Sequence, residues 1–165
     1  MATAISRANQ NKETLRRIRL CSRNPHHVDT KLRREGVPTG HMLPPVSVDV
    51  TRPETLETAF QGSDFVVSLV GILQGTPEQF EKLQWKGAKN IAQASLTAGA
   101  KLIHISAIGA NKNSHIAYER SKGLGEEAVL SICPDAVVIR PSLVFGPGDE
   151  FFGVRTLRHY LYPSG

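Results

Sequence analysis

Cysteine is scarce in this chain, and the positions of the two cysteines argue against two kinds of fold. Cys21 and Cys133 are the only ones among 165 residues, and they lack the paired spacing of a zinc site. Both fall in segments that we expect to be buried. We therefore predict free, reduced thiols in a reducing compartment, and neither a structural metal centre nor a disulfide framework.

Long apolar runs and stripes of basic residues are also missing. The longest apolar run, Phe65 to Leu73, is far shorter than the roughly 20 residues that span a membrane, so we predict no transmembrane segment. The net charge of +5 arises within residues 1–35, where nine Lys/Arg outnumber three Asp/Glu. Because this excess is local, we predict no nucleic-acid partner. A solvated face, a remnant of a targeting sequence or a phosphate site would each explain it.

The sequence does contain an alternation of strand and helix patterns. Helical spacing of apolar residues is found near 54–60, 77–98 and 118–131. Strand patterns lie at 18–22, 46–50, 64–70, 101–108 and 136–140. Strands that alternate with helices are typical of a doubly wound parallel sheet. We therefore predict a single domain of the α/β class.

The stretch 101–122 carries the residues with a chemical pattern. Tyr118 and Lys122 lie four apart at the start of a predicted helix, which places both side chains on one face. A nearby ammonium favours the phenolate and lowers the pKa of a phenol from about 10. Ser106, at the carboxyl end of the preceding strand, would orient a substrate oxygen. The three residues predict a proton-transfer set, although an isolated Tyr-x-x-x-Lys is more often a tyrosine beside a solvated lysine.

Three segments together resemble one enzyme superfamily. Ser106, Tyr118-Glu-Arg-Ser-Lys122 and Arg140-Pro-Ser-Leu-Val-Phe-Gly-Pro147 resemble the short-chain dehydrogenase/reductase superfamily, in its extended and atypical, epimerase-like branch. Within this branch the chain is most similar to the family of the mitochondrial complex I 39-kDa accessory subunit and its bacterial relatives, over residues 18–152. The resemblance implies that Tyr118 is the acid/base, that Lys122 lowers its pKa and that Ser106 orients the substrate oxygen. The chain departs from the branch at Gln84-Trp-Lys-Gly87, where Asn-Val-x-Gly is usual, which weakens the case for the standard active-site water relay.

The resemblance also implies a bound NADP or NAD. Arg23, just beyond the first predicted strand, would meet the 2′-phosphate of NADP. Asp49 would contact the adenine edge. From the residues alone, Arg23 is equally a helix-capping or solvated arginine, and Asp49 equally a cap for the next helix, which we expect to begin with Thr51 as its cap.

Four further residues are implied in cofactor binding. Val70 and Gly71, at the end of a buried strand, would pass under the ribose and the diphosphate. Pro141 opens the loop that closes over the nicotinamide in relatives, and Val144 would lie nearest the nicotinamide ring. These positions follow from the resemblance.

The chain lacks the usual phosphate-binding turn of this architecture. No Gly-x-Gly-x-x-Gly or Gly-x-x-Gly-x-x-Gly occurs in it, and no strand pattern precedes Ile18. In a Rossmann-type sheet the first strand is central, and its glycine-rich turn holds the pyrophosphate. We therefore expect an incomplete Rossmann-type doubly wound parallel sheet that lacks the first strand and the glycine-rich loop, with a marginal fold and weak or absent dinucleotide affinity. The strands on either side of the missing one would pair directly or leave an unpaired edge.

We expect the chain to consist of three parts. Residues 1–17 are an N-terminal helix or a leader-like segment, 18–150 are a partial NAD(P)-binding domain, and 151–165 begin a missing C-terminal region. The chain is thus expected to be truncated at both ends.

Three functions remain open at this point. The first is an NAD(P)-binding accessory subunit of respiratory NADH:ubiquinone oxidoreductase (complex I), or a helper protein that associates with quinone-biosynthesis proteins. The second is an NAD(P)-dependent epimerase/dehydratase or reductase that uses the Ser-Tyr-Lys set. The third is an inactive fragment. The accessory role implies a mitochondrial location on the matrix side of the inner membrane, and the alternative location is cytoplasmic.

Overall fold

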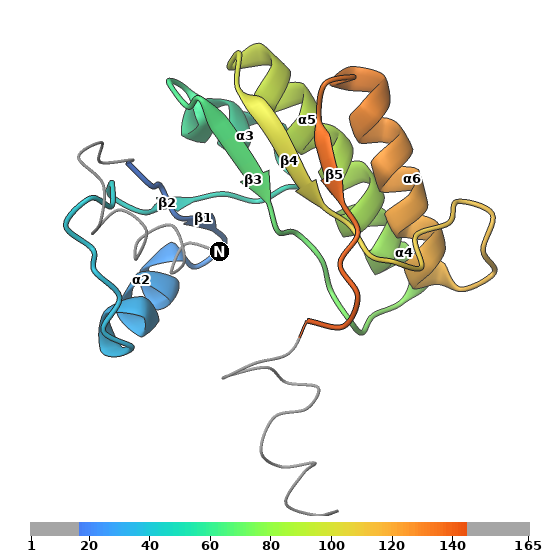
Figure 1. The fold of residues 1–165 in the computed structure, drawn as a ribbon, viewed down its shortest axis with the longest axis horizontal. Helices are drawn as coiled ribbons and strands as arrows, with labels where there is room; N and C mark the ends of the chain where they lie inside the picture. Colours follow the sequence, from blue (N-terminus) through green and yellow to red (C-terminus); the bar gives the residue numbers. More distant parts are fainter. Residues whose placement is uncertain (1–16, 145–165) are drawn as a thin grey trace, which may run out of the picture.

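The computed structural model describes residues 17–144, which form two parallel sheets and a layer of helices (Figure 1). The smaller sheet pairs β1 (Cys21–Ser22) with β2 (Val46–Ser47). The larger sheet has the order β3-β4-β5, formed by β3 (Phe65–Ser68), β4 (Lys101–Ile105) and β5 (Val137–Ile139). The parallel α/β class is therefore confirmed. The predictions for residues 1–16 and 145–165 lie outside the described residues.

The helices begin where the sequence provides start signals. They are α2 (Pro25–Arg34), α3 (Pro53–Phe60), α4 (Pro77–Phe80), the π-helical segment η1 (Glu81–Lys86), α5 (Gly87–Thr97) and α6 (Ala117–Ile132). Proline opens α2, α3 and α4, because its fixed φ suits the first turn of a helix. Asn24 caps α2 by accepting from the His27 amide, so the Asn-Pro pair marks a helix that the strand and helix patterns above did not include. The residue that caps α3 is Arg52 and not Thr51, which was the wrong expectation.

One face of the larger sheet carries the core. Val66 and Leu102 point from β3 and β4 toward the helices and are buried with residues of α3, α5 and α6. The helix layer lies behind the sheet in Figure 1. The core also takes in Val48 and Val50, which follow β2. Through Val48 and Val50, the segment after β2 therefore shares one core with the larger sheet and its helices.

The opposite face of the larger sheet is apolar and open. Phe65 is 54% exposed and Val137 is 53% exposed, and Ile139 is also exposed. Among residues 17–144 no helix lies over this face (Figure 1). Val67, Ile103 and Val137 form one cross-strand row on it. Apolar rows of this kind on an uncovered face favour association with other molecules.

The two sheets do not merge into one. β1 pairs with β2, and β3 pairs with β4, so the strands on either side of the expected gap do not pair directly. Of the two outcomes considered above, the described residues show the unpaired edge, on β3. Arg19 links the two parts of the chain, since its guanidinium donates to the Ala59 carbonyl at 2.8 Å.

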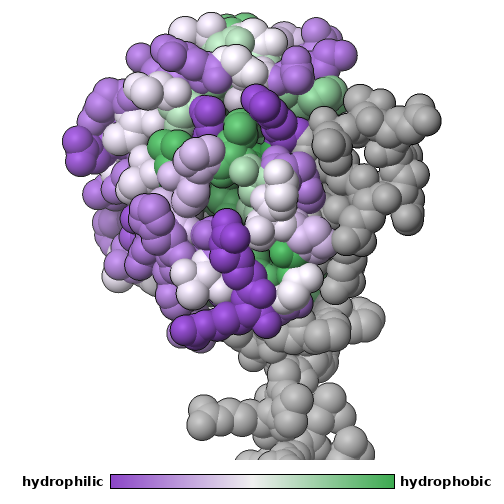
Figure 2. All heavy atoms as spheres, turned by 90° about the vertical axis from the view of Figure 1, so that its left-hand side faces the viewer, coloured by the Kyte–Doolittle hydropathy of each residue, from purple (hydrophilic) through white to green (hydrophobic). Residues whose placement is uncertain are grey.

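The end of the molecule that carries α2 is mostly hydrophilic. The side of the molecule turned toward the viewer in Figure 2 is largely hydrophilic, with few apolar patches. Lys31, Arg33 and Arg34 of α2 are exposed, as expected. Cys21 lies on β1 and is exposed, so its predicted burial was wrong: among residues 17–144 nothing covers the two-stranded sheet at this position. Cys133 is partly buried, and both thiols are free.

Equivalent substitutions on the two faces of the larger sheet are expected to differ in cost. Val66→Thr should lower the free energy of unfolding by about 1–3 kcal/mol, because it buries a hydroxyl in the core. Val137→Thr should change it by less than about 0.5 kcal/mol, because that side chain is exposed. Chemical denaturation of the two variants and the unchanged chain provides the comparison. Equal costs would show that the open face is covered in solution.

Candidate functional site

Lys122 occupies the carboxyl edge of the larger sheet. Its ammonium donates to the carbonyl of Val70 at 3.3 Å and to that of Ile105 at 3.2 Å. These carbonyls lie just after β3 and at the end of β4. The side chain is buried, and burial lowers its pKa, whereas the nearby Glu126 carboxylate opposes that change. A cation buried in this way needs polar partners, and the two carbonyls and the nearby Glu126 carboxylate provide them.

Tyr118 lies one turn before Lys122 on α6, but the two groups are not electrostatically paired. We expected the ammonium to lower the pKa of the phenol. Burial instead raises the pKa of Tyr118, and Lys122 does not contribute to that shift. The Tyr118 ring packs edge-to-face on Phe80, with 5.8 Å between the ring centroids. The phenol is therefore neutral at pH 7 in this structure.

Ser106 follows β4, on the face of the larger sheet that packs against the helices. It is buried, and its hydroxyl contributes to lowering the pKa of Glu126, although its Oγ finds no partner at ordinary hydrogen-bond geometry. Burial opposes the charge on Glu126, while three hydrogen bonds from the Arg140 guanidinium hold the pKa of this carboxyl below its ordinary value. The structure thus places Ser106 and Lys122 near one acidic side chain that the sequence patterns did not single out.

His104 extends this row of buried polar groups. It is 1% exposed, sits two residues before Ser106 on β4 and is paired in register with Ser68 of β3. Burial lowers the pKa of His104 to about 4, with a further contribution from Lys122 that Glu126 opposes. The imidazole is therefore neutral at pH 7. The period of two along a strand could have indicated this position from the sequence, because it places His104 on the same face as Leu102 and Ser106.

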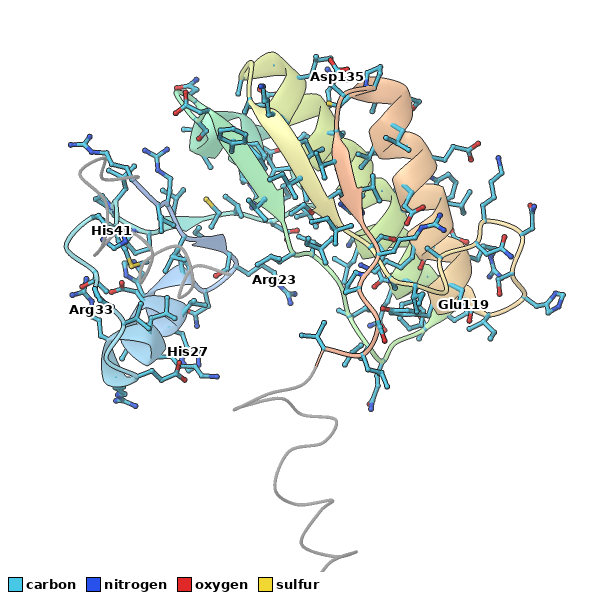
Figure 3. The ribbon with its side chains drawn as sticks, in the orientation of Figure 1. Arg23, His27, Arg33, His41, Glu119 and Asp135 are labelled. Atoms are coloured by element: carbon cyan, nitrogen blue, oxygen red, sulfur yellow. The ribbon has the colours of Figure 1, made fainter. Side chains whose placement is uncertain are left out.

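Arg23 and Asp49 lie at the carboxyl edge of the smaller sheet. The exposed Arg23 follows β1 and extends from that strand toward the larger sheet (Figure 3). Asp49 accepts hydrogen bonds from the amide and the hydroxyl of Thr51, both at 2.9 Å. These bonds hold the pKa of Asp49 below its usual value, with smaller contributions from Arg23 and Lys82. His27 and His41 lie near α2, at the end of the molecule opposite to Glu119 of α6 (Figure 3).

The remaining predicted cofactor residues follow the strand ends. Val70 and Gly71 come directly after β3, and a side chain at Gly71 would press on Gln84 and on Lys122, with its Cβ 3.2 Å from each. Pro141 continues the strand pairing beyond β5, since its carbonyl accepts from the Ile108 amide at 3.0 Å. Val144 is exposed at the end of the described chain. Each predicted site residue therefore either follows the end of a strand or, like Tyr118 and Lys122, belongs to α6.

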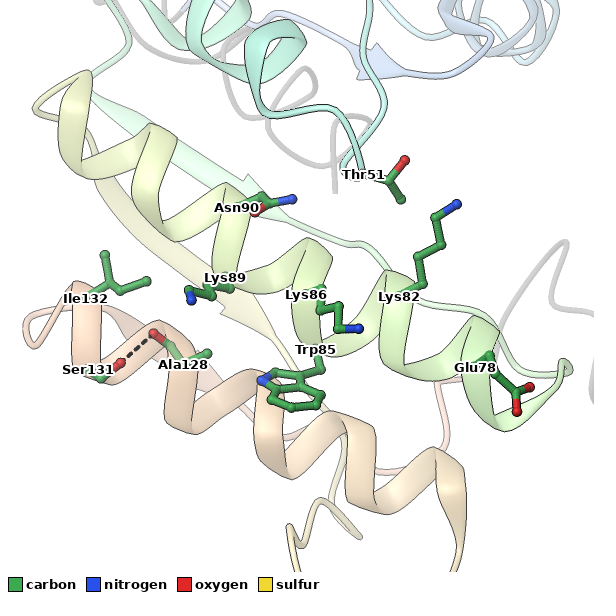
Figure 4. A pocket seen from close by; sticks show the side chains of 10 residues that line it. All are labelled: Thr51, Glu78, Lys82, Trp85, Lys86, Lys89, Asn90, Ala128, Ser131 and Ile132. Carbon is green, nitrogen blue, oxygen red and sulfur yellow. Dashed lines mark hydrogen bonds between the residues drawn. The ribbon is translucent and has the colours of Figure 1, made fainter.

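A separate hollow lies on the outer side of the helices. It is lined by ten residues, and five of them come from the η1–α5 helix: Lys82, Trp85, Lys86, Lys89 and Asn90 (Figure 4). The Lys86 ammonium sits 6.0 Å from the centroid of the Trp85 ring. This hollow does not include the strand ends that carry Val70 and Ile105. Among residues 17–144 there is no cluster of metal-binding side chains and no helix long and apolar enough to span a membrane.

Comparisons with known proteins agree with the resemblance that the motifs predicted. Residues 7–129 match the NAD(P)H-binding family. The ceramide reductase of Caulobacter vibrioides is 33% identical over 105 residues, which are 63% of this chain and 33% of that protein. Subunit 9 of the NADH dehydrogenase [ubiquinone] 1 alpha subcomplex, a mitochondrial protein of Rattus norvegicus, is 37% identical over 105 residues, 62% of this chain and 28% of that protein. The chain thus spans about a third of the length of these relatives.

Solved structures show the same type of fold. The dTDP-4-dehydrorhamnose reductase of Bacillus anthracis, in complex with NADP, superposes with a TM-score of 0.61 at 17% identity, covering 84% of this chain and 57% of that one. The triphenylmethane reductase of Citrobacter sp. has a TM-score of 0.60 at 19% identity, with 86% of this chain and 45% of that one covered. The described sheets are therefore part of a Rossmann-type arrangement.

The buried imidazole of His104 should make stability depend on pH. Its pKa is about 4 in the folded chain and about 6.5 in an unfolded one. The unfolded state therefore binds a proton first as the pH falls from 6.5 to 4, and the free energy of unfolding should fall by up to about 3 kcal/mol over that range. His104→Leu should flatten the curve, whereas His115→Leu, at an exposed loop position, should not. Denaturation at a series of pH values provides the measurement, and identical slopes in all three chains would contradict it.

Proposed function

Because this chain belongs to the NAD(P)H-binding family, we propose that it binds a nicotinamide dinucleotide at the carboxyl ends of β3, β4 and β5, and that Lys122 provides the central cation of that site. Ligands of open parallel sheets bind at this edge. The observation that carries the proposal is the burial of Lys122 between the Val70 and Ile105 carbonyls. It puts a positive charge at the point where two adjacent strands end.

The hydrogen-bond inventory of Lys122 supports a binding role. An ammonium has three N–H donors, and two of them are used by the Val70 and Ile105 carbonyls. Among residues 17–144 no hydrogen bond uses the third, so it could donate to a hydroxyl or phosphate oxygen of the dinucleotide. Gly71 lies beside the ammonium and has no side chain that would obstruct a ligand. The backbone on this side of the ammonium can therefore approach a ribose or a diphosphate closely.

Arg23 and Asp49 would hold the adenosine end of the dinucleotide. Both follow strands of the smaller sheet, and the guanidinium of Arg23 is close enough to lower the pKa of Asp49. An arginine at this place in the fold accommodates the 2′-phosphate of NADP. We therefore propose that NADPH is preferred over NADH. The Asp49 carboxylate is partly engaged by Thr51, so its contact with the adenine edge would use its remaining lone pairs.

The geometry of Tyr118 and Ser106 favours binding over turnover. The pKa of the Tyr118 phenol is raised and not lowered, and the Ser106 hydroxyl lies near the Glu126 carboxylate of α6. We propose that the nucleotide has mainly a structural role in this chain. A reductase role is the second candidate, because Tyr118 and Lys122 are one turn apart on α6 and one relative is a ceramide reductase. In that case Tyr118 would be the acid/base and Ser106 would have to reorient toward the substrate.

The mitochondrial relatives suggest a partner and a location. Two relatives at 32% and 37% identity are mitochondrial NADH dehydrogenase subunits, which supports association with respiratory complex I in the mitochondrion. The alternative cytoplasmic location is supported by the bacterial reductase. The relatives described above give no support to the quinone-biosynthesis alternative. Co-migration of the tagged chain with an inner-membrane complex, retained by Tyr118→Phe, would support the accessory role over the enzyme.

Loss of the Lys122 ammonium should weaken nucleotide binding. Lys122→Met should raise the dissociation constant for NADPH by about tenfold or more, because a charged hydrogen bond is worth about 1.5–3 kcal/mol. Lys112→Met, which removes an exposed lysine from the loop before α6, is the matched control and should leave the constant unchanged. Amide chemical-shift titration of the 165-residue chain covers the weak range expected without a glycine-rich turn. Equal constants for Lys122→Met and the unchanged chain would refute the proposed site.

The preference for NADPH should depend on Arg23. Arg23→Gln should raise the dissociation constant for NADPH and leave that for NADH nearly unchanged, because only NADPH carries the 2′-phosphate. Arg33→Gln, which changes an exposed arginine of α2 paired with Asp29, is the control. The same titration with both dinucleotides measures the ratio. An unchanged ratio in Arg23→Gln would show that Arg23 does not read the phosphate.

A further inference from the structure

The long helix between Pro77 and Thr97 contains a π-helical segment at its centre. Residues Glu81–Lys86 form η1, between the α-helical turns of α4 and α5. Such wide turns are rare and are often found at functional positions. The segment brings Gln84 inward, where it is 1% exposed. This is the position at which the sequence departs from the Asn-Val-x-Gly pattern.

Both polar ends of the Gln84 amide are engaged. Its Oε1 accepts from the Ile72 amide at 3.2 Å, and its Nε2 donates to the Ser121 hydroxyl at 2.9 Å. Ser121 in turn donates to the Tyr118 carbonyl at 2.9 Å. Three hydrogen bonds thus run from the segment after β3 to the first turn of α6.

Two glycines allow this close packing. A Cβ at Gly125 of α6 would lie 2.4 Å from the Gln84 carbonyl oxygen, so the helix backbones touch there. A Cβ at Gly71 would lie 3.2 Å from both the Gln84 Oε1 and the Lys122 Nζ. The segment 70–72 is therefore held from two sides. Lys122 binds the carbonyl of Val70, and Gln84 binds the amide of Ile72.

We propose that Gln84 is a positioning residue that fixes segment 70–72 and, through it, the orientation of the Lys122 ammonium toward the nucleotide. This inference rests on the proposed function, since it concerns the same site. Gln84 does not need to touch the nucleotide. With the Ile72 amide held, the Val70 carbonyl stays in place as a partner for Lys122, and the third donor of the ammonium remains directed toward the open edge.

Removing the Gln84 amide should therefore affect binding through Lys122. Gln84→Met keeps the approximate volume and should raise the dissociation constant for NADPH by about tenfold, the scale of one lost hydrogen bond. Gln84→Met combined with Lys122→Met should bind no more weakly than Lys122→Met alone, because both changes remove the same interaction. Gln93→Met, at an exposed position of α5, is the matched control and should bind like the unchanged chain.

A second readout does not require the nucleotide. The Ile72 amide should lose protection against hydrogen exchange in Gln84→Met and keep it in Gln93→Met. Two results would overturn the inference: an unchanged Ile72 amide, or effects of Gln84→Met and Lys122→Met that multiply in the double variant. If the unchanged chain binds no NADPH, the proposed function fails, whereas protection of Ile72 still decides whether Gln84 holds the segment.

Discussion

The burial of one ammonium organises the described part of this chain. Lys122 bridges the carbonyls that follow β3 and end β4, and it lies beside the Glu126 carboxylate. A buried charge is costly unless dipoles and countercharges replace its water. The surroundings meet this condition, because α6 brings Lys122 and Glu126 to the same face and Arg140 fixes the carboxylate from the end of β5. The ends of all three strands are in this way connected to a single helix.

The same arrangement places buried polar groups on one side of the Lys122 ammonium and exposed residues on the other. Below the ammonium, Gln84, Ser121, His104 and Ser106 are all buried, and Gln84 and Ser121 are linked by hydrogen bonds. Above it, Gly71 after β3 and residues 142–144 after Pro141 are exposed. A site of this kind presents fixed polar groups to a ligand that approaches from the open edge. Polar groups that are fixed before binding lower the cost of reorganisation.

The larger sheet has an open apolar face and, among the described residues, an unpaired edge on β3. Apolar side chains on only one face of the larger sheet contribute to the core of the described residues. The two sheets are joined through the β2–β3 connection, the Val48 and Val50 side chains, and the Arg19 to Ala59 hydrogen bond. These links hold the adenosine side of the proposed site, at Arg23 and Asp49, in a definite place without direct pairing of β1 with β3.

The sequence by itself determined the class of fold, the places of the strands along the chain and the identity of Tyr118 and Lys122 as a helical pair, because local periodicity decides which residues share a face. The expected strands 46–50, 64–70 and 101–108 end later than the strands of the structure, which end at Ser47, Ser68 and Ile105. It also indicated the gap between the two halves of the sheet, since no glycine-rich turn or earlier strand pattern is present. Only the tertiary structure decided what surrounds these side chains. Burial raises the pKa of Tyr118 while Lys122 turns to the Val70 and Ile105 carbonyls, and no local pattern encodes such contacts. Gln84, His104 and Glu126 entered the site for the same reason, because their partners lie on elements that are distant in the sequence and meet only when the helices pack on the sheet.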